Sequence, residues 1–178
     1  AIVAFYGAPA PVENHEIKSC YTALQMQEAL EKLRIKWKKE GGWPDIVYSM
    51  QHRIGLNCGK MVTGNMGSEM RMNYTMMGDT VNLAARLESS AKQYGVYNFV
   101  GENIYEKTKR EFVFRFLDFV KVKGKNIPVK VYELVNSKNN INNKTLKLVQ
   151  LFEKGLDKYY KKKWEDALTL FQKSEEME

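Results

Sequence analysis

The chain has 178 residues, of which 44% are hydrophobic and 28% are charged, and its formal net charge at pH 7 is +7. This composition is that of an average globular protein and excludes disorder as the dominant state. Cys20 and Cys58 are the only cysteines and form no CxxC motif, which excludes a disulfide scaffold and favours a cytoplasmic location. No run of about 18 apolar residues is present, so we expect no membrane contact from this chain.

The first residues, AIVAF at 1–5, are apolar and are not preceded by a methionine. We interpret them as a short buried strand, and the abrupt start indicates a piece of a longer protein that could be membrane-tethered elsewhere. Over residues 15–39, apolar side chains recur at steps of three and four, which predicts an amphipathic helix. Gly41, Gly42 and Pro44 are expected to end it.

Residues 51–57 and 61–65 are predicted to be two strands of a hairpin around Cys58-Gly59-Lys60. The remaining predicted elements are strands at 71–77, 97–100, 112–122 and 129–135, and helices at 79–94 and 102–109. Strands interleaved with helices in this way predict an α+β sandwich, with helices packed on a mostly antiparallel sheet.

The segment 136–143, NSKNNINN, is polar and of low complexity, which is typical of a linker. We therefore predict one domain at 1–135, a linker at 136–144 and a helical hairpin at 145–178. Several residues of the hairpin stand where a tetratricopeptide repeat places its small and aromatic side chains: Gly155, Tyr159, Trp164, Ala167 and Phe171. About three such units are needed for independent stability, so the first repeat of an array and a plain hairpin docked on the domain both remain open.

Three catalytic or binding possibilities can be set aside. A phosphate-binding loop requires Gly-Lys to be followed by Ser or Thr and a helix, whereas Met61 and a predicted strand follow Lys60. His15 and His52 are isolated in the sequence, so no metal site is predicted within this chain. A nucleophilic Cys–His pair is disfavoured, since two cysteines and two histidines allow many chance pairings.

Aromatic and basic residues alternate at 110–125, REFVFRFLDFVKVKGK. This pattern faintly resembles the aromatic strand of an RNA-recognition sheet. The spacing of Phe112, Phe114 and Phe116 equally suits one buried strand face, and we favour core packing over base stacking. No nucleic-acid partner is therefore expected.

The most informative stretch is NYTMMGDTVNLAARLE at 73–88. Asn82 and Arg86 stand four apart in the first turns of a predicted helix and therefore share a face. An amide beside a guanidinium near a helix N-terminus could grip a ribose hydroxyl and a phosphoryl oxygen. On spacing alone, however, a surface ion pair is the favoured interpretation of Arg86.

Taken whole, this stretch closely resembles the signature of the class III nucleotidyl cyclases, the adenylyl and guanylyl cyclase family. The similarity runs from residue 1 to about residue 134, in matching order and spacing. The other matching segments are AIVAFYGAP at 1–9, RIGLNCG at 53–59, GNMGS at 64–68 and VKVKGKNIPVKVYEL at 120–134.

The resemblance implies a ferredoxin-like cyclase sandwich that here lacks its N-terminal part. It also implies conversion of ATP to cyclic AMP and pyrophosphate, at a site shared head to tail with a homodimer partner or a second cyclase domain. In the family pattern, Asn82 orients the ribose and Arg86 stabilises the transferring phosphoryl group. Lys123 holds the terminal phosphates, while Thr75 and Met76 contact the substrate, Thr75 at the purine-selecting position, where threonine favours adenine.

The chain also departs from the family pattern. The two aspartates that bind Mg²⁺ or Mn²⁺ in the family precede the position of Ala1, as does a lysine that completes purine selection, so we expect metal ligands upstream of this chain. This departure leaves open a second hypothesis, a catalytically inactive module that dimerises and docks a protein partner through its helical tail.

Overall fold

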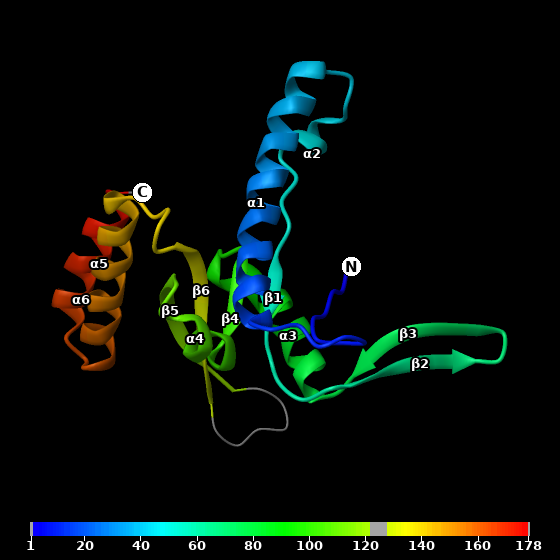
Figure 1. The fold of residues 1–178 in the computed structure, drawn as a ribbon. Helices are drawn as coiled ribbons and strands as arrows, with labels where there is room; N and C mark the ends of the chain where they lie inside the picture. Colours follow the sequence, from blue (N-terminus) through cyan, green and yellow to red (C-terminus); the bar gives the residue numbers. More distant parts are fainter. Residues whose placement is uncertain (1, 122–127, 178) are drawn as a thin grey trace.

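A computed structural model of the chain describes residues 2–121 and 128–177 (Figure 1). The elements in chain order are α1 (His15–Glu40), α2 (Asp45–Tyr48), β1 (Ile54–Leu56), β2 (Val62–Ser68), β3 (Arg71–Met77), α3 (Asp79–Tyr94), β4 (Asn98–Gly101), α4 (Glu102–Thr108), β5 (Phe112–Val120), β6 (Val129–Ser137), α5 (Asn143–Tyr160) and α6 (Trp164–Glu175). The predicted α+β class is confirmed. None of the helices in these two ranges is long and apolar enough to cross a membrane.

Four strands form the central sheet in the order β1-β4-β6-β5. β1 runs parallel to β4, whereas β4–β6 and β6–β5 are antiparallel pairs, so the prediction of a mostly antiparallel sheet is confirmed. In β5, the register shifts between Phe116 and Asp118, which leaves Leu117 as the extra residue of a bulge. A bulge of this kind changes which side chains face which side of the sheet.

Both faces of the sheet are covered. Because neighbouring strand residues point to opposite faces, Val100 packs toward α1 and α4, whereas Phe99 packs toward α3. The α1 side also buries Phe112 and Phe114, with Phe116 partly buried against them. These phenylalanines therefore serve the core, as favoured from their spacing, and are not a base-stacking platform.

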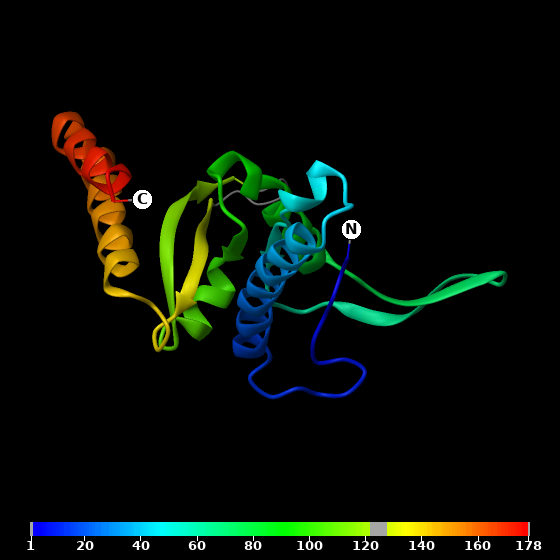
Figure 2. The same ribbon diagram turned by 90° about the horizontal axis from the view of Figure 1, so that it is seen from above.

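The predicted hairpin of residues 51–57 and 61–65 is wrong. β1 pairs with β4 in the central sheet, and β2 pairs with β3 in a separate two-stranded ribbon, from Val62 opposite Met77 to Ser68 opposite Arg71. β2 and β3 are joined by a two-residue turn at Glu69 and Met70, so their pairing closes a very short loop at little entropic cost. The ribbon projects from the body as an arm, visible in both ribbon views (Figures 1 and 2).

The predicted N-terminal strand is also wrong for the residues that are described. Residues 2–5 lie in no strand, and Ile2 is 90% exposed. A strand is stable when its backbone groups are paired, and none of the strands in the described ranges pairs with this segment. Instead the Phe5 ring stacks on Tyr74 of the arm, with 6.1 Å between ring centroids.

The long helix α1 confirms the helix predicted over residues 15–39, but its amphipathic pattern is used only in part. Cys20 and Ala23 in its first half are buried in the core. The second half extends past the sheet (Figure 1), where Leu33 and Ile35 are exposed and Trp37 contacts Trp43 before α2.

The C-terminal helical hairpin is confirmed as α5 and α6. Val149 and Ala167 are buried, and Gly155 lies against Phe171. A Cβ atom at Gly155 would meet that ring at 2.8 Å, so the two helices approach closely where glycine is present. The assignment of the hairpin to a tetratricopeptide repeat, and the domain limits at 135 and 145, stay predictions.

Candidate functional site

The predicted site residues lie on β3 and α3, which are separated by a single residue, Gly78. Its carbonyl oxygen accepts hydrogen bonds from the backbone N–H groups of Val81 and Asn82, both at 3.1 Å. The helix begins at Asp79 and has no side-chain cap at its N-terminus. Asn82 therefore sits in the first turn, where backbone N–H groups point out of the helix and favour anions.

α3 divides cleanly into a buried face and an exposed face. Leu83, Leu87 and Ala91 are buried against the sheet, and their spacing of four residues follows the helical period. Asn82 and Arg86 lie on the exposed part of the helix. The structure thus places these two side chains one turn apart, as predicted, and on the solvent-exposed part of α3.

The position of α3 is fixed by backbone approach to β1. A Cβ atom at Gly55 would lie 2.2 Å from the carbonyl oxygen of Ala84 and 2.5 Å from the backbone nitrogen of Glu88. Only glycine permits helix and strand to lie this close. The contact sets the height of α3 above the sheet in the part of the helix that carries Arg86 on its opposite, exposed face.

A side chain just after β1 holds the first turn of α3. The Asn57 amide donates to the carbonyl oxygen of Thr80 at 3.1 Å, while its own Oδ1 is buried and accepts no hydrogen bond. Gly59 also lies close to Thr80, where a Cβ atom would meet Oγ1 at 2.7 Å. Sequence reasoning missed these anchoring roles, although the RIGLNCG motif that contains Gly55, Asn57 and Gly59 was part of the recognised pattern.

Thr75 and Met76 are neighbours on β3 and are half-buried. Thr75 lies opposite Gly64 and Met76 opposite Thr63 in the arm. Because consecutive strand residues point to opposite faces, the side chains of Thr75 and Met76 do not share a face. The glycine opposite Thr75 leaves the space across the strand pair free of a side chain.

Two further predictions concern Lys123 and the metal ligands. Lys123 lies outside the described residues. The described part of the chain contains no group of three or more His, Cys, Asp or Glu side chains that could hold a metal ion. No metal site is thus formed by these described residues, and the metal ligands of the family pattern stay an expectation.

The cysteines are unsuited to nucleophilic chemistry. Both are buried and free, and burial raises the pKa of the Cys20 thiol to about 12 and raises that of Cys58. A nucleophilic cysteine needs a lowered pKa, so the structure gives no support to a Cys–His pair.

A separate groove of about 750 Å³ lies between α1 and the ends of β4 and β6, lined by residues such as Leu24, Gln27 and Asn98. Asn82, Arg86, Thr75 and Met76 do not line it. The groove is therefore distinct from the surface that α3 and β3 present.

Residues 1–136 match the family described as the adenylate and guanylate cyclase catalytic domain. This match covers most of the chain and agrees with the sheet and the α3 surface described above. The chain belongs to this family.

Named relatives include adenylate cyclases of distant organisms. The chain is 32% identical over 142 residues to adenylate cyclase 1 of Rhizobium meliloti, an alignment that covers 80% of this chain and 21% of the relative. It is 36% identical over 129 residues to the terminal-differentiation specific adenylate cyclase of Dictyostelium discoideum, covering 70% of this chain and 6% of the relative. The chain thus spans about a fifth or less of the length of these two relatives.

Solved structures of the family share the fold. The adenylyl cyclase CyaB of P. aeruginosa superposes with a TM-score of 0.64 at 26% identity, covering 77% of this chain and 68% of that one. The guanylyl cyclase Cya2 superposes with a TM-score of 0.60 at 27% identity, covering 77% and 66%. A structure named adenylyl cyclase and one named guanylyl cyclase therefore share this architecture. The fold does not by itself distinguish adenine from guanine.

Proposed function

We propose that the protein containing this chain is an adenylate cyclase, which converts ATP to cyclic AMP and pyrophosphate. The observation that carries the proposal is the exposed pair Asn82 and Arg86 on α3, in a chain that belongs to the cyclase family. The named adenylate cyclase relatives support ATP as the substrate.

In this reaction the ribose 3′ hydroxyl gives up its proton to solvent as its oxygen attacks the α-phosphorus. The bond between that phosphorus and the oxygen that bridges to the β-phosphate breaks, and pyrophosphate leaves. Negative charge grows on the phosphoryl oxygens and on the leaving group. The Arg86 guanidinium stabilises that charge where it develops, which is the kind of interaction that accelerates a chemical step. The Asn82 amide orients the ribose, and Lys123 binds the pyrophosphate portion.

Adenine selection is assigned to Thr75. Its hydroxyl can both donate and accept a hydrogen bond, and the absence of a side chain at Gly64 leaves room beside it. Since the side chain of Met76 faces the other way, Met76 contributes through its main chain.

None of the residues named here is assigned a metal-binding role, because the described residues contain no group of three or more side chains that could hold a metal ion. This chain contributes the residues that orient the ribose, stabilise the transition state and bind the terminal phosphates. It shares the site with a second cyclase domain in a head-to-tail dimer. Metal ligands upstream of this chain remain an expectation from the family pattern.

The test is cyclic nucleotide formation by the full-length protein, assayed with ATP and with GTP. We expect cyclic AMP to be the main product. Arg86→Ala is expected to lower turnover on the order of a hundredfold with folding intact, since it removes charge stabilisation made in the transition state. The matched control is Arg110→Ala, because Arg110 is an exposed arginine between α4 and β5. Equal turnover in the two variants would contradict the role of Arg86.

One observation favours a second candidate, a module that only associates. The arm carries several exposed apolar side chains, among them Val62, Met70, Met72 and Met77, and exposed apolar surface of this kind is typical of interaction sites.

The variant Lys123→Ala distinguishes the adenylate cyclase from the module that only associates. An adenylate cyclase loses affinity for an ATP analogue in this variant, whereas an inactive dimerisation module that docks a partner through its tail does not.

A further inference from the structure

The carboxylate of Asp118 joins three elements. Its Oδ2 accepts a hydrogen bond from the Tyr94 hydroxyl at 2.9 Å, and its Oδ1 accepts one from the Tyr160 hydroxyl at 3.0 Å. The same Oδ1 lies 2.7 Å from the backbone nitrogen of Phe119. Tyr94 is the last residue of α3 and Tyr160 is the last residue of α5. Asp118 therefore links the helix that carries Asn82 and Arg86 to the C-terminal hairpin.

Asp118 is well placed to hold both tyrosines. It directly follows the Leu117 bulge of β5, and bulges redirect side chains. Burial, together with the hydrogen bond to Asp118, raises the pKa of Tyr94 and of Tyr160 to about 12. Both hydroxyls are therefore protonated donors at neutral pH.

The hairpin is attached to β5 along α5, so the Tyr160 contact is not isolated. The Glu153 carboxylate accepts a hydrogen bond from the backbone N–H of Phe116 at 3.1 Å. The Arg115 guanidinium lies 4.8 Å from the centre of the Phe152 ring, within the range of a cation–π contact. Phe152 also packs against the buried cluster beneath α3. Figure 2 shows α5 beside β5 on the side of the molecule away from the arm.

We propose that Asp118, Tyr94 and Tyr160 are positioning residues, through which the α5–α6 hairpin fixes the C-terminal end of the catalytic helix α3. The proposal rests on the proposed function for its catalytic consequence. The N-terminal end of α3 is held by Asn57 at Thr80 and its middle by the Gly55 contact. The hydrogen bonds of Asp118 with Tyr94 and Tyr160, here called the Asp118 junction, hold α3 at a third point. Loss of the Tyr160 hydrogen bond would free the C-terminal end of α3 from the hairpin.

The test compares Tyr160→Phe with Tyr159→Phe in the full-length protein. Both tyrosines are about half exposed and both substitutions remove only a hydroxyl, but the Tyr159 hydroxyl has no hydrogen bond among those described. The first readout, amide hydrogen exchange across α3, does not depend on activity. We expect Tyr160→Phe to raise exchange in the last two turns of α3 roughly threefold to tenfold, as loss of one hydrogen bond allows. Tyr159→Phe is expected to have no effect.

The second readout is a double-mutant cycle. If Tyr160 acts through Asp118 on Tyr94, adding Tyr160→Phe to Tyr94→Phe raises α3 exchange no further. Additive effects, or equal exchange in Tyr160→Phe and Tyr159→Phe, would refute the proposal that Tyr160 acts on α3 through Asp118 and Tyr94.

The third readout is catalytic. We expect Tyr160→Phe to lower kcat severalfold with KM for ATP unchanged, because the variant displaces Arg86 without removing a substrate contact. Raised exchange with unchanged kcat would overturn the positioning role while leaving the contact in place. A wild-type protein that makes no cyclic nucleotide would instead refute the proposed function, and the exchange measurement would still decide whether the hairpin is coupled to α3.

Discussion

Gly55 is the residue at which β1 approaches the backbone of α3. A methyl group there would overlap the backbone of Ala84 and Glu88, and backbone atoms inside a helix cannot rotate away as a side-chain end can. We predict that Gly55→Ala destabilises the fold by about 1–3 kcal/mol, the usual cost of overpacking. Gly64→Ala is the matched control, since a Cβ atom at Gly64 has nothing within 4 Å. The measurement is the urea midpoint of unfolding, and equal midpoints for the two variants would refute the close packing.

At this scale the sequence predicts the candidate site residues better than the contacts that hold them in place. The four-residue step between Asn82 and Arg86 is sufficient to place them on one helical face, because that periodicity is local. The contact between Gly55 and α3 is not local, as it depends on how a strand and a helix from different parts of the chain pack. Likewise, alternation along β3 separates the side chains of Thr75 and Met76, a distinction that a motif match does not make.

One carboxylate forms an ion pair between α1 and α4. Glu16 at the start of α1 is nearly buried, pairs with Lys107 of α4 and lies 3.0 Å from the His15 ring nitrogen. Burial alone would raise the pKa of Glu16, but the Lys107 hydrogen bond and the nearby positive charges hold that pKa below its ordinary value of 4.5. A lowered pKa in the folded state means that the stabilisation is complete above the ordinary value and is lost as pH falls through the folded value.

We therefore predict that Glu16→Gln lowers the free energy of unfolding by about 1 kcal/mol at pH 7. The difference from wild type should shrink as the pH is lowered below 4.5. Urea titrations at pH 7 and pH 3.5 measure both quantities. Glu28→Gln is the control, because Glu28 pairs with Lys32 at 2.6 Å on the exposed part of the same helix. A gap for Glu16→Gln that stays constant between the two pH values would contradict the charge-based explanation.

Helices and strands were predictable where the sequence pattern is local. The prediction was wrong where the partner of a strand had to be inferred. The predicted helices and the strands at β3, β5 and β6 follow from periodicity and from the glycines that end them. The sequence predicts β1 and β2 in outline, but β1 pairs with β4 and β2 pairs with β3 instead of with each other. The two-residue turn after β2 favours its pairing with β3. The apolar contacts of Ile54 and Leu56 hold β1 against the central core.

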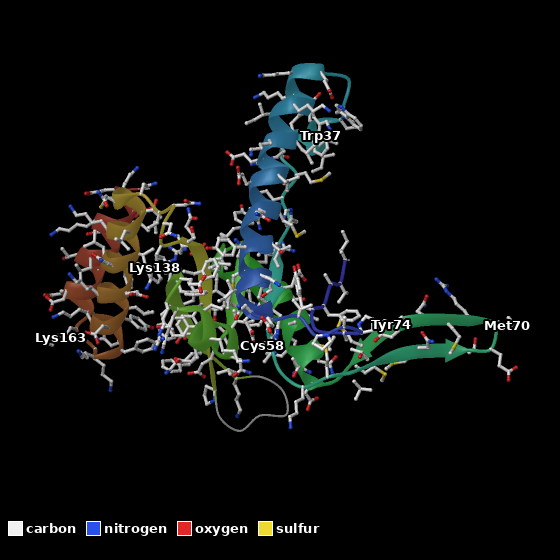
Figure 3. The ribbon with its side chains drawn as sticks, in the orientation of Figure 1. Trp37, Cys58, Met70, Tyr74, Lys138 and Lys163 are labelled. Atoms are coloured by element: carbon white, nitrogen blue, oxygen red, sulfur yellow. The ribbon has the colours of Figure 1, made fainter. Side chains whose placement is uncertain are left out.

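Across the whole molecule, the arm and the C-terminal hairpin lie on opposite sides of the sheet body, as Figures 1 and 2 show. The arm places Met70 at its tip and Tyr74 nearer the body (Figure 3), and Met70 is 96% exposed. The exposed apolar side chains of the arm are thus well separated from the Asp118 junction. A substitution on the arm therefore leaves the contacts of the hairpin with β5 untouched.

This separation allows a direct prediction about assembly. A site that takes groups from two chains exists only in the dimer, so turnover per chain should fall when the full-length protein is diluted below its dimer dissociation constant. Met72→Glu places a charge on the exposed apolar arm and should shift that fall to higher protein concentration by tenfold or more, the equivalent of about 1.4 kcal/mol. Met26→Glu, at an exposed methionine of α1, is the matched control. Initial rates and sedimentation velocity measured over the same dilution series test both statements. Turnover per chain that stays constant while sedimentation shows dissociation would mean that each chain carries a complete site, and the shared-site proposal would be wrong.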